Sequence, residues 1–459
     1  MKKIFYFLTI ILLLTISACT NDILDKKPVS NLAGTGFYKS MDDARAGVYG
    51  IYDAAQSVFR INFAYWGEGR ADNVRTRHSG EELSLLQNNL NATLGSANWT
   101  NLYTMISRAN YAIKYIPEVS SDGGEKQLLG QAHALRALAY FYLVRIWGDV
   151  PLVTEPYIST QQDIFLTKTD RELVWDQIEK DLEFASQNCV DRFNNNNDRI
   201  MFTKGGADAL LTKVYFWRNK LTEAEQASLR VLNNPLYALE TSMDDWSKIF
   251  TNGYSKESIF EIGYDETDQA NSLRVLYAIG SDAIYTPSEK FMNSYEDGDL
   301  RIPYIYDTAV AEPKAIWKFL GKDVSDESPA ASDQNIVLIR LADIVLLRAE
   351  ILSKNGGDSN IVEAIELLNT IRRRAGLEEF QNISEVTAKY ESLEEAILHE
   401  RSIELSFEGH RWFDLVRTNN AIATMQPING LNNPKNLFWP ISESALNKNP
   451  NLEQNEFYK

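Results

Sequence analysis

The segments "WTNLYTMISRANYAIKYI", Trp99 to Ile116, and "KQLLGQAHALRALAYFYLVRIWG", Lys126 to Gly148, decide the fold. Each segment repeats apolar residues every three or four positions, which is the spacing of one helix face. The stretch "SSDGG" between them ends in two glycines and favours a turn. Alanines recur through the second segment and permit close approach of another helix. The two segments therefore predict a pair of antiparallel helices.

The same helical periodicity recurs along the rest of the chain. A helix is expected at 40–59, and further pairs are expected at 171–188 with 204–221, 335–357 with 360–376, and 392–409 with 410–420. Such pairs resemble tetratricopeptide units, although their separation is far from a regular repeat of about 34 residues. The sequence predicts a mainly α fold whose scaffold is four tetratricopeptide-like helix pairs.

A loop-rich insertion with short strands is expected between about 241 and 334. This region is rich in turns and aromatic residues, and it contains one credible strand, "SIFEIGY", at 258–264. In helical-repeat proteins, insertions of this kind usually form a binding face.

The N-terminus has the features of a lipoprotein signal. Lys2 and Lys3 precede an apolar run that is too short to cross a bilayer. The run ends in "ISAC", which resembles a bacterial lipobox and makes Cys19 the predicted lipidation site. We therefore expect a signal peptide at 1–18, a lipidated tether at 19–36 and a single domain at 37–459. Multiple acyl chains would hold the protein stably at a membrane.

The charge argues against a nucleic-acid-binding protein, and the cysteine count argues against a disulfide-stabilised one. The chain has 46 Lys and Arg against 63 Asp and Glu, and its net charge of −17 becomes −19 once Lys2 and Lys3 leave with the signal peptide. Such a surface repels nucleic acid and anionic lipid headgroups. Only Cys189 would remain besides Cys19, so no intramolecular disulfide is expected in the folded domain.

The stretch "FEGHRWFDLVR", Phe407 to Arg417, crowds charged residues and a histidine together and invites a catalytic interpretation. Its charged residues are spaced three apart, however, which places them along one helix flank. The four histidines of the chain do not have the spacing of metal ligands. The stretch is therefore predicted to be scaffold, with no catalytic residue, no metal and no cofactor.

Several motifs in order resemble the SusD/RagB family of nutrient-binding outer-membrane lipoproteins of Bacteroidetes. They are "ALRALAYFYLVRIWGDVPLV", "LRAEILSKNGG...AIELLNTIRRRAGL", "GHRWFDLVR" and the tail "WPISESALNKNPNLEQNEFY". Together with the lipobox they cover essentially the whole chain. The resemblance implies a SusD-like fold.

The resemblance also implies a function. SusD-like proteins are not enzymes; they bind oligosaccharides or similar nutrients at the cell surface and act as a lid on a TonB-dependent transporter of the SusC type. We therefore expect a lipid-anchored, surface-exposed outer-membrane protein that captures a glycan and delivers it to such a transporter.

Sugar recognition indicates where to look for the ligand. An exposed aromatic ring covers the apolar face of a pyranose, and polar side chains pair with its hydroxyls. The segment "AYWGEGRADNVRTRH", at 64–78, combines Trp66 with Asp72, Arg75 and Arg77, and the family's ligand contacts commonly include such a loop. The alternative is a structural loop whose tryptophan packs inward.

The insertion supplies three more candidates, Tyr285, Tyr295 and Trp317. Their spacing is too irregular for one amphipathic element, which favours loops that face a ligand. Two of them also have a structural interpretation, because Tyr295 could brace a turn and Trp317 could be a strand residue packed on the core.

Three other functions remain open from the sequence. The cargo could be a peptide or another nutrient captured by the same lid, because a fold does not name its ligand. A glycoside hydrolase would need two carboxylates about 5–9.5 Å apart, and no motif singles out such a pair. A tetratricopeptide-type interaction scaffold would need a groove lined with Asn, Lys and Arg.

Overall fold

The computed structural model describes residues 34–119, 123–159, 161–265, 269–277, 283–306, 308, 315–319 and 333–459. The predicted signal peptide, Cys19 and most of the predicted tether lie outside the described residues. The first described element is α2 (Gly34–Phe37), which includes the last positions of that tether. Within the described ranges, no helix is long and apolar enough to cross a bilayer.

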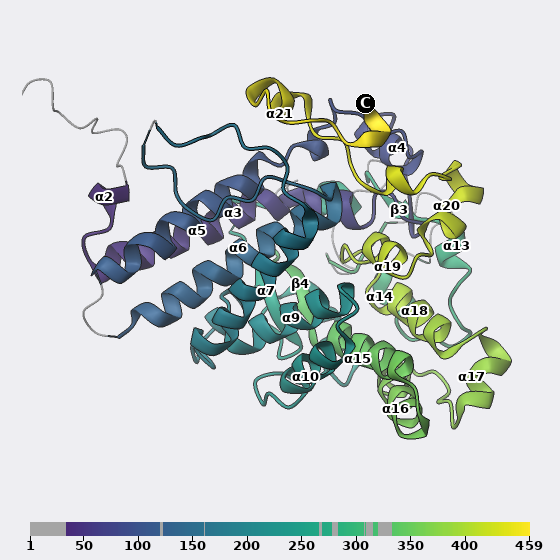
Figure 1. Cartoon of the computed structure of the whole chain (residues 1–459). Coiled ribbons are helices and arrows are strands. Elements are labelled where there is room, and N and C mark those ends of the chain that lie inside the picture. The colour runs from purple at the N-terminus through teal and green to yellow at the C-terminus, as the bar shows by residue number, and fades with distance from the viewer. Residues whose placement is uncertain are drawn as a thin grey trace, which may run out of the picture.

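Long helices that pack side by side make up most of the fold (Figure 1). The N-terminal group is α3 (Met41–Gly67), α5 (Thr100–Val119), α6 (Glu125–Trp147) and α7 (Arg171–Asn188). It continues through α9 (Lys204–Trp217) and α10 (Leu221–Leu232) to α15 (Leu341–Asn355) and α16 (Asp358–Arg374). The C-terminal group is α17 (Ile383–Lys389), α18 (Leu393–Glu404), α19 (Arg411–Arg417), α20 (Ala421–Asn429) and α21 (Glu443–Lys448).

Short elements connect these helices. The helical ones are α4 (Glu81–Leu86), α8 (Asn197–Ile200), α11 (Met243–Thr251), α12 (Leu273–Tyr277), α13 (Glu289–Met292), α14 (Ile302–Ile305), and the 3₁₀ turns η3 (Gly95–Ala97), η5 (Pro434–Leu437) and η6 (Glu456–Tyr458). The strands β1 (Val74–Arg75) and β3 (Thr286–Pro287) form one antiparallel pair, and β2 (Ser258–Ile262) and β4 (Ile336–Arg340) form another.

The mainly helical fold predicted from the sequence is confirmed. Three of the predicted helix pairs pack as expected: α5 with α6, α7 with α9, and α15 with α16. In the fourth pair, α18 packs against α15 and α16, whereas α19 packs against α3 and α20. The alanines of α6 are fully buried, so this helix lies inside the fold and contacts α3, α5, α7 and α9.

The structure corrects the helix predicted at 335–357. Its first residues form β4, which pairs with the predicted strand β2 and leads directly into α15. All five residues of β4 are buried. A short, continuous apolar run is typical of both a buried strand and a buried helix, and only the partner strand decides between them.

The structure also corrects the end of the first long helix. Helix α3 runs to Gly67, so Trp66 lies in its last turn and not in the loop that follows. Side chains three and four positions apart share a helix face, and Phe59, Phe63 and Trp66 extend the buried stripe of α3. The apolar spacing of the earlier part of the helix thus continues farther than predicted.

A buried network of ion pairs joins the insertion to the stretch that contains "FEGHRWFDLVR". The guanidinium of Arg340 contacts Glu257 at 2.7 Å, Glu404 at 2.6 Å and Glu408 at 2.8 Å, and all four side chains are fully buried. Lys318 also pairs with Glu408. Because isolated charges are costly to bury, each of these groups depends on its partners, and the stretch serves as scaffold here.

Candidate functional site

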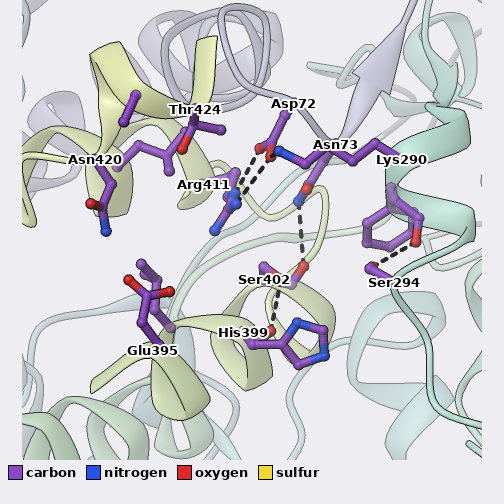
Figure 2. Close-up of a pocket in the computed structure, with 14 residues that line it drawn as sticks. Asp72, Asn73, Lys290, Ser294, Glu395, His399, Ser402, Arg411, Asn420 and Thr424 are labelled. Carbon is purple, nitrogen blue, oxygen red and sulfur yellow. Dashed lines mark hydrogen bonds and ion pairs between the residues drawn. The ribbon is translucent and has the colours of Figure 1, made fainter. Parts of the chain in front are cut away.

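Two adjoining pockets lie beside the chain that follows α3. The first, the Arg411 pocket, has a volume of about 320 Å³ (Figure 2). The second, the Arg75 pocket, has a volume of about 480 Å³. Asp72 and Lys290 line both pockets, so the pockets meet at these two side chains. Together they form the Asp72 site.

Asp72 is held by two cations from distant parts of the chain. Arg411, the first residue of α19, donates to it from Nε at 2.8 Å and from Nη2 at 3.1 Å. Lys290, on α13, contacts the same carboxylate, with a distance of 2.7 Å from Nζ to Oδ2, which also accepts from Nη2 of Arg411. Figure 2 shows the Asp72, Lys290 and Arg411 side chains converging. The insertion and the C-terminal helices thus meet at a carboxylate that was predicted to contact ligand.

The two cations keep Asp72 ionised. Burial alone would raise the pKa of its carboxyl, but Arg411 and then Lys290 outweigh burial and hold the pKa well below its usual range. Arg411 is largely buried, whereas the Lys290 side chain is 56% exposed. Asp72 is therefore a fixed negative charge, and Lys290 is the exposed cation beside it.

Polar groups from four segments surround the Arg411 pocket. The Asn73 side chain donates to the carbonyl of Ser402 at 3.3 Å, which ties the loop after α3 to α18. Burial lowers the pKa of His399 to about 4, so its ring is neutral at pH 7. The lining includes the polar residues Asn73, Ser294, Glu395, His399, Asn420 and Thr424. Such groups both donate and accept hydrogen bonds, as sugar hydroxyls require.

The Arg75 pocket contains a second sequence-predicted residue. Arg75 is half-buried on β1, and its Nε donates to Oγ1 of Thr286 on β3 at 3.2 Å. Arg77 is exposed beyond the end of β1 and does not line either pocket. The structure therefore brings Asp72 and Arg75 together at one site and leaves Arg77 outside its lining.

The expectation that Trp66 is an exposed stacking ring is wrong. Its side chain is 1% exposed, and its Nε1 donates to the carbonyl of Ser96 at 2.9 Å. The ring packs against Trp147 and Tyr142. The inward-packing alternative applies, because Trp66 belongs to the buried face of α3.

The insertion aromatics are also more buried than expected. Tyr285 is fully buried against Tyr65, which corrects its expected exposure, and burial raises its pKa well above 10. Tyr295 is half-buried and packs edge-on against Phe291. Trp317 is half-buried, and its amide donates to the carbonyl of Ile305 at 2.8 Å. None of the three lines the Asp72 site.

Several residues of the site were missed in the sequence. Arg411 was interpreted only as one charge of a helix flank, although the sequence does place it on a helix near Gly409. Its partner lies 339 positions away, and no local pattern signals such a pair. Lys290 follows a buried strand within the insertion, and its only sequence signal is the general expectation that insertions carry binding residues.

Neither a metal-binding cluster nor a reactive thiol is found among the described residues. Among them, no group of three or more His, Cys, Asp and Glu side chains is placed to hold a metal ion. Cys189 is buried, and burial raises the pKa of its thiol to about 12, which leaves it un-ionised. The polar Asp72 site can bind a ligand through hydrogen bonds and charge.

Two family models match this chain. The model described as "SusD family" matches residues 314–458, and the model described as "Starch-binding associating with outer membrane" matches residues 22–216. The first match contains Arg411, and the second contains Asp72 and Arg75. The Asp72 site thus draws residues from both matched regions.

Similar proteins extend the match to the whole chain. "SusD-like protein P38" of Formosa agariphila is 32% identical over 98% of both chains. "Starch-binding protein SusD" of Bacteroides thetaiotaomicron is 33% identical over 30% of this chain and 24% of its own length. The solved structure of a "Laminarin binding SusD-like protein" has a TM-score of 0.77 and 25% identity, and it covers 92% of this chain and 100% of its own. The sequence motifs, the fold and these relatives together establish that the chain belongs to the SusD family.

Proposed function

We propose that this protein binds an oligosaccharide at the Asp72 site, captures it at the cell surface and delivers it to a SusC-like, TonB-dependent outer-membrane transporter. The observation that carries the proposal is the convergence of Asp72, Lys290 and Arg411 on a pocket rimmed by hydroxyl and amide side chains. Relatives named for starch and laminarin binding support a glycan as the class of cargo.

Hydrogen bonding is the chemistry that the Asp72 site offers. The pair with Asp72 uses two of the three guanidinium nitrogens of Arg411, and the Lys290 side chain, whose ammonium group pairs with Asp72, is 56% exposed. Thr424 adds a hydroxyl from α20, and Asn420, the residue just before that helix, adds an amide. Fixed donors and acceptors of this kind recognise the orientation of sugar hydroxyls. Trp317 is half-buried and does not line this site, so the proposal gives it no stacking role there.

Binding without catalysis is part of the proposal. A glycosidase needs one carboxyl that can donate a proton, with its pKa raised. Asp72 has the opposite property, because its two cationic partners hold its pKa well below the usual range. It is therefore suited to accept hydrogen bonds from hydroxyls and unsuited to protonate a leaving group.

The membrane tether belongs to the proposal as well. Cys19 would carry the lipid and would hold the protein at the outer membrane, in keeping with the family description "associating with outer membrane". Replacement of Cys19 with alanine should release the protein from the membrane fraction and abolish fatty-acid labelling. A Cys19→Ala protein that stays acylated would contradict the tether.

Calorimetric titration of the full-length protein in mild detergent tests the cargo. The ligands are starch- and laminarin-derived heptasaccharides and a set of peptides of similar length. We expect one glycan to bind and the double variant Lys290→Met/Thr424→Ala to weaken that binding about tenfold or more. Lys354→Met removes the same charge from an exposed position on α15 and is the control. Binding of peptides alone would contradict the glycan proposal.

A further inference from the structure

A second hollow lies on a different part of the molecule. It has a volume of about 570 Å³ and lies between the middle of α3, the α8 segment and the end of β2. We call it the tyrosine hollow. Its lining includes Tyr49, Tyr52, Asp53, Asn197, Tyr254 and Tyr264. It shares no residue with the Arg411 pocket or the Arg75 pocket, so it is a separate site.

Two rings of the tyrosine hollow are exposed and two are anchored. Tyr49 is 51% exposed and Tyr254 is 37% exposed. Tyr264 is buried and donates its hydroxyl to the carbonyl of Gln56 at 2.8 Å, while the Tyr52 hydroxyl accepts from the amide of Phe202 at 2.9 Å. A hollow lined by both exposed and anchored tyrosines offers a ligand aromatic surface with polar hydroxyl groups.

The backbone of Tyr254 is held in an unusual conformation. Its φ of 58° is in the left-handed region, which a tyrosine rarely adopts. Its amide donates to both carboxylate oxygens of Glu261, at 2.9 and 3.1 Å. Asn335 donates to the same carboxylate at 2.6 Å, and Glu261 is fully buried. Residues kept in such conformations by their surroundings cluster at functional sites, and here the outcome is an exposed ring.

The charge of the tyrosine hollow restricts its ligand. The ionisable lining groups other than tyrosine are Asp53, Glu261 and Asp265, and no Lys, Arg or His is among the described lining residues. Asp53 forms an ion pair with Arg108 at 2.6 Å, while the Glu261 carboxylate accepts hydrogen bonds from Tyr254 and Asn335. Among the described lining residues, an anionic ligand would meet carboxylates and no cation. A neutral ligand with an apolar face and hydroxyls would meet matching groups.

We propose that the tyrosine hollow is a second saccharide site, which takes a neutral sugar unit. The C–H face of the sugar stacks on Tyr254 or Tyr49, and its hydroxyls bond to Asp53 and Asn197. This inference rests on the proposed function for the class of cargo but not for the location. The Asp72 site recognises sugar through charge and hydrogen bonds, and the tyrosine hollow recognises it through stacking, so one chain can hold a long glycan at two places.

The test is a titration of the full-length protein with starch- and laminarin-derived heptasaccharides. The main variant is Tyr254→Gly, because glycine adopts a φ of 58° freely, so the change removes the side chain without straining the backbone. Phe457→Ala removes an exposed ring elsewhere and is the matched control. We expect two binding events in the wild type. Tyr254→Gly should lower the affinity of one of them about tenfold and leave the other unchanged. A sulfated heptasaccharide should lose binding at this hollow.

The outcomes separate the two proposals. If Lys290→Met/Thr424→Ala removes one event and Tyr254→Gly removes the other, both sites stand. If Tyr254→Gly changes nothing while Lys290→Met/Thr424→Ala removes all binding, the tyrosine hollow is overturned and the Asp72 site stands. If only Tyr254→Gly removes binding, the hollow stands and the Asp72 site is overturned. If the heptasaccharides do not bind at all, both proposals are overturned.

Discussion

Arg411 and Asp72 lie 339 positions apart in the sequence, and their side chains form a bidentate ion pair with distances of 2.8 and 3.1 Å. The pair joins the start of α19 to the loop after α3. It also fixes the carboxylate at which the two pockets of the Asp72 site meet. One ion pair is therefore both part of the fold and part of the candidate site.

Replacing Asp72 with asparagine should destabilise the protein at neutral pH. Arg411 would remain buried without its counter-charge, and the expected loss is about 3 kcal/mol. Because the folded pKa of Asp72 is depressed, its contribution is present above the unfolded pKa of about 4 and is lost as the pH falls through the folded pKa. Urea unfolding at pH 7 and pH 3 should therefore give a smaller difference between wild type and variant at pH 3.

The control for this prediction is Lys290→Met, which removes the exposed partner of the same carboxylate. The Lys290 side chain is exposed and Asp72 keeps its pair with Arg411, so the expected change in unfolding free energy is at most about 1 kcal/mol. Equal losses for Asp72→Asn and Lys290→Met would contradict the view that Arg411 is the partner on which stability depends.

Glu68 should produce the opposite dependence on pH. Burial raises the pKa of Glu68 to about 8, against the lowering effect of the amides of Gly409 and His410, which donate to its Oε1. A raised pKa means that its contribution is fully present below the unfolded pKa and is lost as the pH rises through about 8. Between pH 5 and 8, Glu68 is ionised in the unfolded chain and protonated in the folded one. The free energy of unfolding should therefore fall by up to about 1.4 kcal/mol per pH unit.

The measurement is the difference between wild type and Glu68→Gln in urea at several pH values. The variant cannot ionise at this position, so the wild type should lose stability relative to it as the pH rises from 5 to 8. Parallel curves would mean that Glu68 does not change its protonation on folding.

Trp66 should matter for stability and not directly for ligand contact. Trp66→Ala would leave a cavity beside Trp147 and Tyr142, at an expected cost of about 3–5 kcal/mol. Trp66→Phe keeps an aromatic ring but loses the hydrogen bond to Ser96. Folded Trp66→Phe protein should bind any glycan ligand of the wild type within about twofold. Loss of binding by well-folded Trp66→Phe would restore the original interpretation of this residue.

The sequence was most informative where the interactions are local. The helices at 99–116 and 171–188 were predicted closely, because periodic apolar residues report the buried face of a helix directly. The strand β4 was missed because its identity depends on β2, which lies about 80 positions earlier. Trp66 was placed in a loop because its burial depends on what packs against the last turn of α3.

The candidate site could be predicted only in part, for the same physical reason. Asp72 and Arg75 were found as polar residues after a long helix, and both line the Asp72 site. Arg411 and Lys290 reach that site from other segments, and their pairing with Asp72 follows from the packing of α19 and α13. The exposed rings of Tyr49 and Tyr254 were overlooked, since nothing local distinguishes them from the buried tyrosines of the chain.

The last prediction concerns the close approach that makes the Arg411 and Asp72 pair feasible. Gly67, the final residue of α3, lies against the backbone of Gly409, where a side chain on Gly67 would overlap the Gly409 carbonyl. Gly409 has a φ of 80°, and a Cβ there would lie 2.8 Å from the carbonyl oxygen of Phe63. Gly409→Ala should therefore cost about 3 kcal/mol, from backbone strain plus the steric clash.

Gly430→Ala separates these two causes. Gly430 has a φ of 78°, nearly the same as that of Gly409, but a Cβ there would meet no atom within 4 Å. Its replacement should therefore cost only the backbone strain, about 1 kcal/mol. Urea unfolding of the two variants gives the steric part by difference. If Gly409→Ala and Gly430→Ala lose equal stability, the close contact between α3 and the turn before α19 is not a constraint. A larger loss of stability for Gly409→Ala, accompanied by weaker glycan binding at the Asp72 site, would mean that the close contact at Gly409 helps to set the position of Arg411 beside Asp72.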